Sequence, residues 1–250
     1  MTNFSFKKLQ KLQNGSDIRG VALTGIPGEE VNLTPGVSTR LGRAFAIWLR
    51  KQNTGSGKVA VGTDSRISGA SLKEAFISGL VSEGFDVMDC GLASTPAMFM
   101  STIHPDHGIN GAVMLTASHL PFNRNGMKFF TSRGGFDKGN IFELLQIAAD
   151  KLPEPETEKG HTEKLDFISE YSTFLVEAIR KGVNDPDHYQ KPLQGLKIIV
   201  DAGNGAGGFF AGKVLEPLGA DTSGSQFLQP DGRFPNHVPN PEDPEAMASI

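Results

Sequence analysis

Cysteine is almost missing from this sequence, which has a single such residue, Cys90, among its 250. One thiol cannot form an intrachain disulfide, so the fold does not rest on the bridges of small secreted domains. Long apolar runs are missing as well, since none approaches the length of a membrane-spanning helix or a signal-peptide core. These shortages favour a globular protein of a reducing compartment, with the cytoplasm as the expected location and no membrane partner.

A block of one charge sign is also absent. Lysine and arginine number 24 against 28 aspartate and glutamate, for a net charge of −4. Without a basic stripe, the chain lacks the electrostatic pattern of a nucleic-acid surface, so small-molecule chemistry is favoured. The first sixteen residues differ, because they carry Lys7, Lys8 and Lys11 and no acid. A plastid targeting remnant, and hence the plastid stroma, is therefore the alternative location.

The apolar residues that are present, 38% of the chain, follow the periods of helices and strands in alternation. Thr34-Pro35 is typical of a helix start, with a cap and a first-turn proline. The expected elements that follow are a strand over Lys58–Val61, a helix through Leu72 and Leu80, a strand over Phe85–Met88, a short helix from Thr95, strands over Ile109–Leu115 and Gly126–Thr131, and a helix over Asp137–Asp150. This alternation predicts an α/β fold, a three-layer αβα domain with a mixed, largely parallel sheet, over residues 1–150.

A second, incomplete α/β domain is expected over residues 165–250. Residues 151–164 are polar, hold two prolines and lack periodicity, which predicts a linker. An amphipathic helix then begins near Ile168, and the run Leu196–Val200 predicts the first strand of the second domain. Near the end, Asp243-Pro244 starts a helix that reaches Ile250 after about two turns without a C-terminal cap. We therefore expect a truncated domain and a chain that is inactive alone.

A serine and a histidine, Ser118 and His119, follow the predicted strand Ile109–Leu115 closely. In open α/β sheets ligands bind beyond the carboxyl ends of the strands, so these residues are placed where chemistry is expected. A serine that carries a phosphoryl group divides one difficult transfer into two easier ones. A Ser-His pair alone is a weak signal, because most serines are solvated turn residues.

Three more motifs accompany the pair in a set order: DIRG at 17–20, GTDSR at 62–66 and NG-K at 125–128, each interpreted as containing a turn. With TASH-P at 116–121 they resemble the α-D-phosphohexomutase superfamily, which includes phosphoglucomutases, phosphomannomutases and phosphoglucosamine mutases. The resemblance covers nearly the whole chain but only the family's N-terminal portion. It implies an isomerase of carbohydrate metabolism that moves a phosphoryl group between the 1 and 6 positions of a hexose phosphate, through an active-site phosphoserine and a hexose bisphosphate.

The resemblance also implies roles for single residues. Ser118 becomes the phosphoserine, and its phosphate becomes a ligand of Mg²⁺. Arg19 binds phosphate oxygens, because its planar guanidinium can do so bidentately. Lys128 compensates charge and carries out acid–base work, while His119 orients substrate or shares the proton. Catalysis is therefore assigned to these four residues.

Asn125 and Arg66 complete the expected substrate- and phosphate-binding set, with Arg66 bracing the turn near Arg19. The chain departs from the family at Leu120, where family members commonly have asparagine. It also lacks the family's DGD-x-D-type magnesium loop, so the remaining Mg²⁺ ligands are not expected in this chain. The motifs do not select among glucose, mannose and glucosamine phosphates, nor do they indicate an oligomeric state.

Two other functions stay open. The first is a non-catalytic, mutase-derived binding or regulatory protein, which Leu120 and the missing motifs favour. The second is a dinucleotide-binding oxidoreductase, because residues 201–208 (DAGNGAGG) match G-x-G-x-x-G. Asp201 would put a negative charge beside the pyrophosphate, however, so tight packing is the favoured role of these glycines. The proline-rich stretch Pro230–Glu242 is too long for a simple connection, which favours a functional or interface role.

Overall fold

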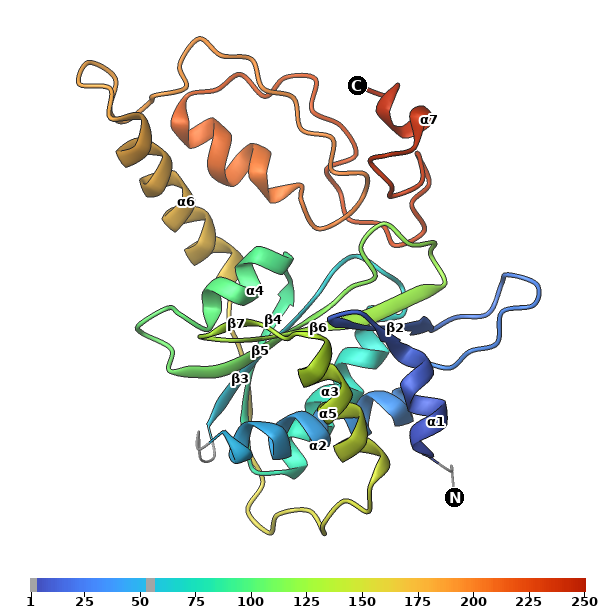
Figure 1. Cartoon of the computed structure of the whole chain (residues 1–250). Helices are drawn as coiled ribbons and strands as arrows, with labels where there is room; N and C mark the ends of the chain where they lie inside the picture. Colours follow the sequence, from blue (N-terminus) through green and yellow to red (C-terminus); the bar gives the residue numbers. More distant parts are fainter. Residues whose placement is uncertain (1–3, 53–56) are drawn as a thin grey trace. The chain divides into compact units, whose positions relative to one another are not determined.

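The structure is a computed structural model that describes residues 4–52 and 57–250 (Figure 1). These residues form two compact units. The first unit extends to Leu165, apart from two short loops. The second unit consists of those loops, Ser65–Ile67 and Ser118–Pro121, together with Asp166–Ile250.

A mixed sheet forms the centre of the first unit. Its strands are β1 (Gln13–Asn14), β2 (Asp17–Val21), β3 (Lys58–Thr63), β4 (Asp86–Leu92), β5 (Ile109–Leu115), β6 (Arg124–Thr131), β7 (Gly134–Gly135) and β8 (Thr162–Lys164). Among the described residues their order is β1-β2-β6-β5-β3-β4-β8, with β7 beside β6. Strands β5, β3, β4 and β8 run parallel, whereas β1, β2, β6 and β7 pair antiparallel.

Helices cover both faces of this sheet. They are α1 (Phe6–Leu9) with the 3₁₀ turn η1 (Gln10–Leu12), α2 (Pro35–Lys51), α3 (Gly69–Ser82), α4 (Thr95–Ser101) and α5 (Lys138–Ala149). The expected cap at Thr34 is present, because its hydroxyl accepts from Val37 N. Asp137 caps α5 as well, since its carboxylate accepts from Asn140 N. Helix α4 lies on one face and α2, α3 and α5 on the other (Figure 1). The three-layer αβα prediction is confirmed.

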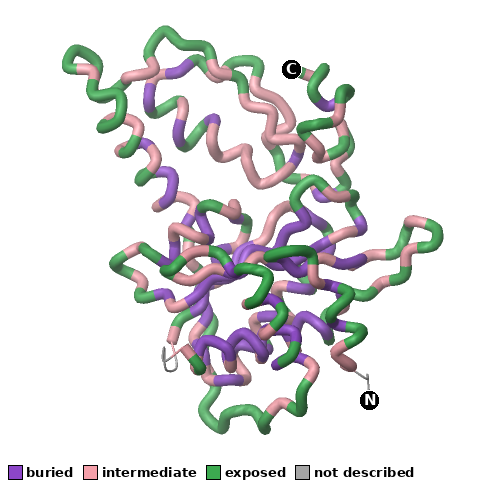
Figure 2. Tube along the Cα trace, in the orientation of Figure 1, coloured by how far each residue is buried: buried purple, intermediate pink, exposed green. Residues whose placement is uncertain are grey.

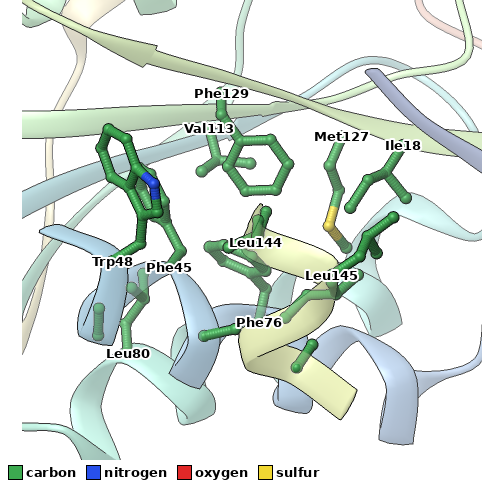
Figure 3. Packing of buried hydrophobic residues seen from close by; sticks show 14 of the residues in the cluster. Ile18, Phe45, Trp48, Phe76, Leu80, Val113, Met127, Phe129, Leu144 and Leu145 are labelled. Atoms are coloured by element: carbon green, nitrogen blue, oxygen red, sulfur yellow. The ribbon is translucent and has the colours of Figure 1, made fainter. Parts of the chain in front are cut away.

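An aromatic cluster fills the space between the sheet and α2, α3 and α5 (Figure 3). Phe129 comes from β6 and lies 5.0 Å from Phe45 of α2, centroid to centroid. Trp48 of α2 lies 4.4 Å from Phe136 in the same way. Phe76 of α3 is fully buried beneath them. Burial of aromatic side chains at this density is the main source of stability available to this unit.

Two of the expected turns are strands. Residues 17–20 lie in β2 and residues 125–128 in β6, where Arg19 is paired with Gly126. Gly126 sits between strands, since a Cβ on it would lie 2.3 Å from Ile18 O and 2.9 Å from Thr116 O. The glycine therefore permits close strand packing instead of a turn, and the turn interpretation of both motifs is wrong.

The expected linker, residues 151–164, is also part of the first unit. Its end forms β8, which pairs parallel with β4. Earlier, the Arg43 guanidinium donates to Pro153 O (2.5 Å), and Glu156 N donates to Ser82 O (3.0 Å). These bonds hold a non-periodic, polar segment against the helices, so the linker interpretation is corrected and the unit ends at Leu165.

The second unit is centred on one long helix. Its elements are α6 (Phe167–Val183), the π-helical segment η2 (Phe210–Leu215), the 3₁₀ turn η3 (Glu216–Leu218) and α7 (Pro244–Met247). Asp166 caps α6 by accepting from Ser169 N (3.2 Å). The apolar face of α6 packs Val176 against Val214 and Leu218, which confirms the predicted amphipathic helix.

The run Leu196–Val200 does not form the predicted strand. It makes two isolated parallel bridges instead, Lys197 with Asp221 and, just beyond the run, Asp201 with Gln226. Between these bridges three residues (198–200) lie opposite four (222–225), and Ser225 Oγ accepts the hydrogen bond of Val200 N (3.0 Å). A continuous ladder is thereby interrupted. Little of this unit is fully buried (Figure 2).

Candidate active site

The motifs GTDSR and TASH-P leave the same edge of the sheet. Strands β3 and β5 are parallel neighbours, and the chain continues from β3 to Asp64 and from β5 to Thr116. The Asp64 carboxylate accepts from the Thr116 hydroxyl at 2.7 Å, and Asp64 N donates to Leu115 O at 3.1 Å. These bonds fix the base of the loop that carries Ser118, at the carboxyl edge where the sequence predicts a site.

Ser118 is exposed and has a left-handed backbone, with φ of 56°. Its hydroxyl lies 3.4 Å from Nδ1 of His119, which is exposed as well. A non-glycine residue with positive φ is uncommon and is retained only where the surroundings hold it. The loop therefore presents a hydroxyl with an imidazole beside it, which is the pair that the sequence predicts.

Asp17 brings Arg19 and Lys128 together in the first unit. Its Oδ2 accepts from Arg19 Nη2 at 3.0 Å and from Lys128 Nζ at 2.6 Å. The Asp17 carboxylate is 10% exposed, whereas the Arg19 and Lys128 side chains are 19% and 26% exposed. The two cationic side chains thus stay partly accessible to solvent while one carboxylate holds them. An incoming phosphate can bind the same two cations.

Sequence reasoning did not include Asp17 in the site. A signal was available, because residues two apart on a strand point to the same face, and Asp17 and Arg19 have that spacing. The DIRG motif was interpreted as a turn, which hid this relation. Once β2 pairs with β6, the carboxylate reaches Lys128, which is 111 residues away in sequence.

Arg66 turns inward and bonds to the loop backbone. It is 2% exposed, and its guanidinium donates to the carbonyls of Ser118 (2.8 Å), Leu120 (2.6 Å) and Pro121 (2.7 Å). A buried guanidinium that donates to three backbone carbonyls is not accessible to a substrate phosphate. The expectation that Arg66 binds substrate phosphate is therefore corrected, and the segment it braces is the serine loop.

Asn125 is likewise structural. It is completely buried, its amide donates to Ser68 Oγ at 2.9 Å, and its Oδ1 accepts from Gly126 N at 2.8 Å. A side chain with no solvent exposure cannot receive a substrate. The assignment of Asn125 to substrate binding is wrong, because the sheet places it beneath the surface, where it ties β6 to the start of α3.

The glycine-rich motif of the second unit organises loops. Asp201 accepts from Gly203 N (2.8 Å), and Asn204 donates to Gln229 O (2.9 Å). A Cβ on Gly208 would lie 2.1 Å from Leu228 O, so this glycine allows a close backbone approach. The Gly203 amide, which a bound dinucleotide would need, already donates to Asp201. The close approach at Gly208 agrees with tight packing, the role that the sequence favours for these glycines.

A part-buried pair of titratable side chains lies in the same region. His237 Nε2 lies 3.2 Å from Asp201 Oδ2, and its Nδ1 lies 2.8 Å from Val238 O. The hydrogen bond to the Val238 carbonyl is the largest cause of the raised pKa of His237. Burial lowers this pKa, and the Asp201 carboxylate raises it further. Burial raises the pKa of Asp201, but hydrogen bonds from Gly203, Gln226 and Ser249 outweigh burial and lower it. Each shift therefore favours the charged form of its group.

Magnesium prefers several free oxygen ligands, and two carboxylates of the second unit, Asp201 and Asp231, do not meet that need. Asp201 is engaged by the donors given above. Asp231 accepts from Arg233 at 2.5 Å, and this bond lowers the pKa of Asp231 to about 2. Within the described part of that unit, these carboxylates are committed to protein donors.

Comparisons with known proteins agree with the motifs. The model of the phosphoglucomutase/phosphomannomutase α/β/α domain I matches residues 10–151, and that of domain II matches residues 169–250. A phosphomannomutase of Escherichia coli is 33% identical over 237 residues, which are 92% of this chain and 47% of that protein. A phosphoglucomutase/phosphomannomutase of Thermococcus kodakarensis is 36% identical over 88% of this chain and 46% of its own length.

A solved structure is similar as well. The crystal structure of a phosphoglucomutase/phosphomannomutase family protein from Burkholderia thailandensis superposes with a TM-score of 0.77 and 29% identity, over 96% of this chain and 49% of that one. The chain thus spans about half the length of the relatives it matches. Among the described residues, no helix is long and apolar enough to cross a membrane.

Proposed function

Because the chain belongs to the phosphoglucomutase/phosphomannomutase family, we propose that it provides the phosphoryl-transfer serine of a phosphohexomutase. The observation that carries the proposal is the presentation of Ser118, an exposed hydroxyl in a strained loop with His119 Nδ1 3.4 Å away. Hexose phosphates are the proposed substrates, since the similar proteins are named for mannose and glucose phosphates. A hexose bisphosphate is the proposed partner that charges the serine.

The proposed cycle has two transfers. A free sugar hydroxyl attacks the phosphorus on Ser118, so that its P–O bond to the serine breaks and a new P–O bond forms at the sugar. The sugar hydroxyl gives up its proton, and the serine oxygen takes one. The resulting bisphosphate reorients and returns its other phosphoryl group to Ser118, which leaves the isomeric hexose phosphate. In each of the two transfers, one oxygen displaces another at phosphorus, and the protein contributes by positioning the reacting groups.

We assign Lys128 to the proton and Arg19 to phosphate, with His119 orienting substrate or sharing the proton. The support is the geometry at Asp17, whose single carboxylate holds both cations. A phosphoryl group carries about −1.5 to −2 charge at neutral pH, which exceeds that of one carboxylate. Incoming phosphate can therefore draw the cations from Asp17. Mg²⁺ stays the expected cofactor, with the Ser118 phosphate as its proposed ligand.

The test of the proposed function is labelling of Ser118. Protein expressed from its complete reading frame is incubated with glucose 1,6-bisphosphate and Mg²⁺, and its peptides are analysed by mass spectrometry. We expect a phosphoryl group on Ser118 and none in the Ser118→Ala variant. An unlabelled Ser118 in protein that still binds hexose phosphate by calorimetry would support the non-catalytic binding protein instead.

The role of Lys128 is separable from folding. Lys128→Met should reduce phosphoryl transfer by about 10²- to 10⁴-fold, the usual contribution of an acid–base group. Lys73→Met is a matched control, because Lys73 also pairs with a part-buried carboxylate, Asp89, at 2.6 Å. We expect similar small losses of melting temperature in both variants and a loss of activity in Lys128→Met alone. Proportional loss of both properties in Lys128→Met would make Lys128 structural and move the role to His119.

A further inference from the structure

The backbone of Ser118 is held in a conformation that serine does not favour. Its φ of 56° lies in the left-handed region, where the Cβ crowds the backbone. The residue is exposed, so packing of its own side chain does not stabilise this conformation. Contacts to the loop backbone can supply the restraint.

Arg66 supplies such contacts. Its Nη2 donates to Ser118 O (2.8 Å) and Leu120 O (2.6 Å), and its Nη1 donates to Pro121 O (2.7 Å). The two nitrogens of a planar guanidinium point in set directions, so three carbonyls bound to them have defined relative positions. A lysine ammonium lacks this planar fork and cannot reproduce the geometry.

Arg66 is itself restrained by the loop Asp231–Phe234. Its guanidinium carbon lies 5.3 Å from the centroid of the Phe234 ring, a cation–π distance. The same loop approaches the turn that carries Arg66 at Gly232, where a Cβ would lie 2.3 Å from Ser65 O and 2.8 Å from Arg66 Cα. Asp231 N in turn donates to Asn204 O at 2.8 Å. The proline-rich stretch thus has a defined position against the arginine.

We propose that Arg66 is a positioning residue that holds the Ser118 loop in its left-handed form, and that Gly232 and Phe234 hold Arg66 in turn. The inference rests on the proposed function for its catalytic consequence, because a phosphoryl group on Ser118 is directed by the backbone that bears it. Because the loop is already ordered, the activation free energy of each transfer does not include the entropy of ordering the Ser118 loop. Arg66 therefore acts through Ser118 and does not touch substrate.

The experiment compares Arg66→Lys with the wild type. Hydrogen exchange of the amides from His119 to Phe122 should become at least about tenfold faster in Arg66→Lys, because two of the three carbonyl bonds are lost. Phosphoryl transfer from glucose 1,6-bisphosphate should show a kcat at least about 100-fold lower with KM within about threefold, since substrate contacts are kept. Unchanged exchange at the loop would overturn the proposal.

A second pair of variants guards against a folding defect. Gly232→Ala should accelerate the same loop amides and lower kcat, although less than Arg66→Lys does. Gly207→Ala is its control, because Gly207 has no neighbour within 4 Å of the added Cβ, and it should change neither property. If Gly232→Ala leaves the loop amides as protected as Gly207→Ala does, the supporting role of Asp231–Phe234 is refuted.

The two proposals fail in different ways. If the wild type takes no label on Ser118 but Arg66→Lys still loosens the loop, the positioning inference stands and the mutase assignment fails. If the wild type is labelled and Arg66→Lys transfers phosphate at the same rate with the same protection, the mutase assignment stands and the positioning inference fails.

Discussion

The two compact units of this chain are held together differently. The first buries a continuous cluster of aromatic and aliphatic side chains between its sheet and α2, α3 and α5. The buried cluster around α6 in the second unit consists of Val176, Val214 and Leu218, and its other order comes from polar networks around Asp201 and Asn204. Stability from apolar burial scales with buried area, whereas polar networks depend on charge state and geometry. The first unit should therefore respond to cavities and the second to pH.

The largest effect is expected from a cavity in the first unit. Phe76→Ala should cost about 3–5 kcal/mol in the free energy of unfolding, because the side chain is fully buried. The same change at Phe174 of α6, which is 50% exposed, should cost less than about 0.5 kcal/mol. Urea unfolding followed by Trp48 fluorescence reports on the first unit, since Trp48 is the single tryptophan. Circular dichroism follows the loss of helical structure in the second unit. Equal costs at the two positions would remove the contrast between the units.

A smaller effect is expected from the charge pair of the second unit. The pKa of His237 is raised in the folded state, so its stabilisation is complete below about pH 6.5 and is lost as the pH rises through the raised value. The pKa of Asp201 is lowered, so its contribution is present above about pH 3.9 and is lost as the pH falls. Stability of this region should therefore be highest between those values.

The measurement is hydrogen exchange of the amides near residues 201–204 and 236–238, corrected for the intrinsic effect of pH. His237→Gln should lose about 1 kcal/mol of local stability at pH 6, because the part-buried Asp201 carboxylate loses a charged hydrogen-bond partner. The loss should shrink as the pH rises, because the wild type then loses the same interaction. Asp243 adds to the raised pKa of His237, and Asp243→Asn should lower the pH at which protection falls. A pH-independent difference would contradict the charge-pair account.

The helix caps should have similar and modest effects in both units. Asp137 caps α5 through a capping box and Asp166 caps α6, so alanine at either position should cost about 1 kcal/mol. The Trp48 transition should move with Asp137→Ala and stay in place with Asp166→Ala. If Asp166→Ala also shifts the Trp48 transition, the units unfold together and the comparison between them must be revised.

The smallest effect is expected in the run that fails to form a strand. Ile199 is 43% exposed, so Ile199→Thr should change stability by less than about 0.5 kcal/mol. Thermal unfolding by circular dichroism checks this. A loss above about 1 kcal/mol would show that Ile199 is packed in a continuous strand in solution, and the second unit would then resemble the first more closely than the structure indicates.

Local patterns in the sequence predicted much of the first unit. The strand Ile109–Leu115 has the predicted bounds, the helix start at Thr34 has the predicted cap, and a helix begins directly after Asp137 as predicted. These features depend on neighbouring residues, namely an aliphatic run, a proline in the first turn and a polar cap. Ser118 and His119 were also placed correctly at the end of a strand, because chain connectivity alone sets that position.

The tertiary structure decided the roles of the other motif residues. Arg66 and Asn125 are chemically suited to phosphate and substrate, yet packing buries both and directs them to backbone and side-chain partners inside the protein. The segment 151–164 has no periodicity to indicate a strand, and its last residues become β8 because the edge of β4 offers backbone partners. The sequence by itself determined most helices and strands of the first unit, their order along the chain and the motif that carries the serine. Only the sheet order, which pairs β2 with β6, could bring Asp17 to Lys128, because contacts across 111 residues depend on long-range packing that local patterns do not encode.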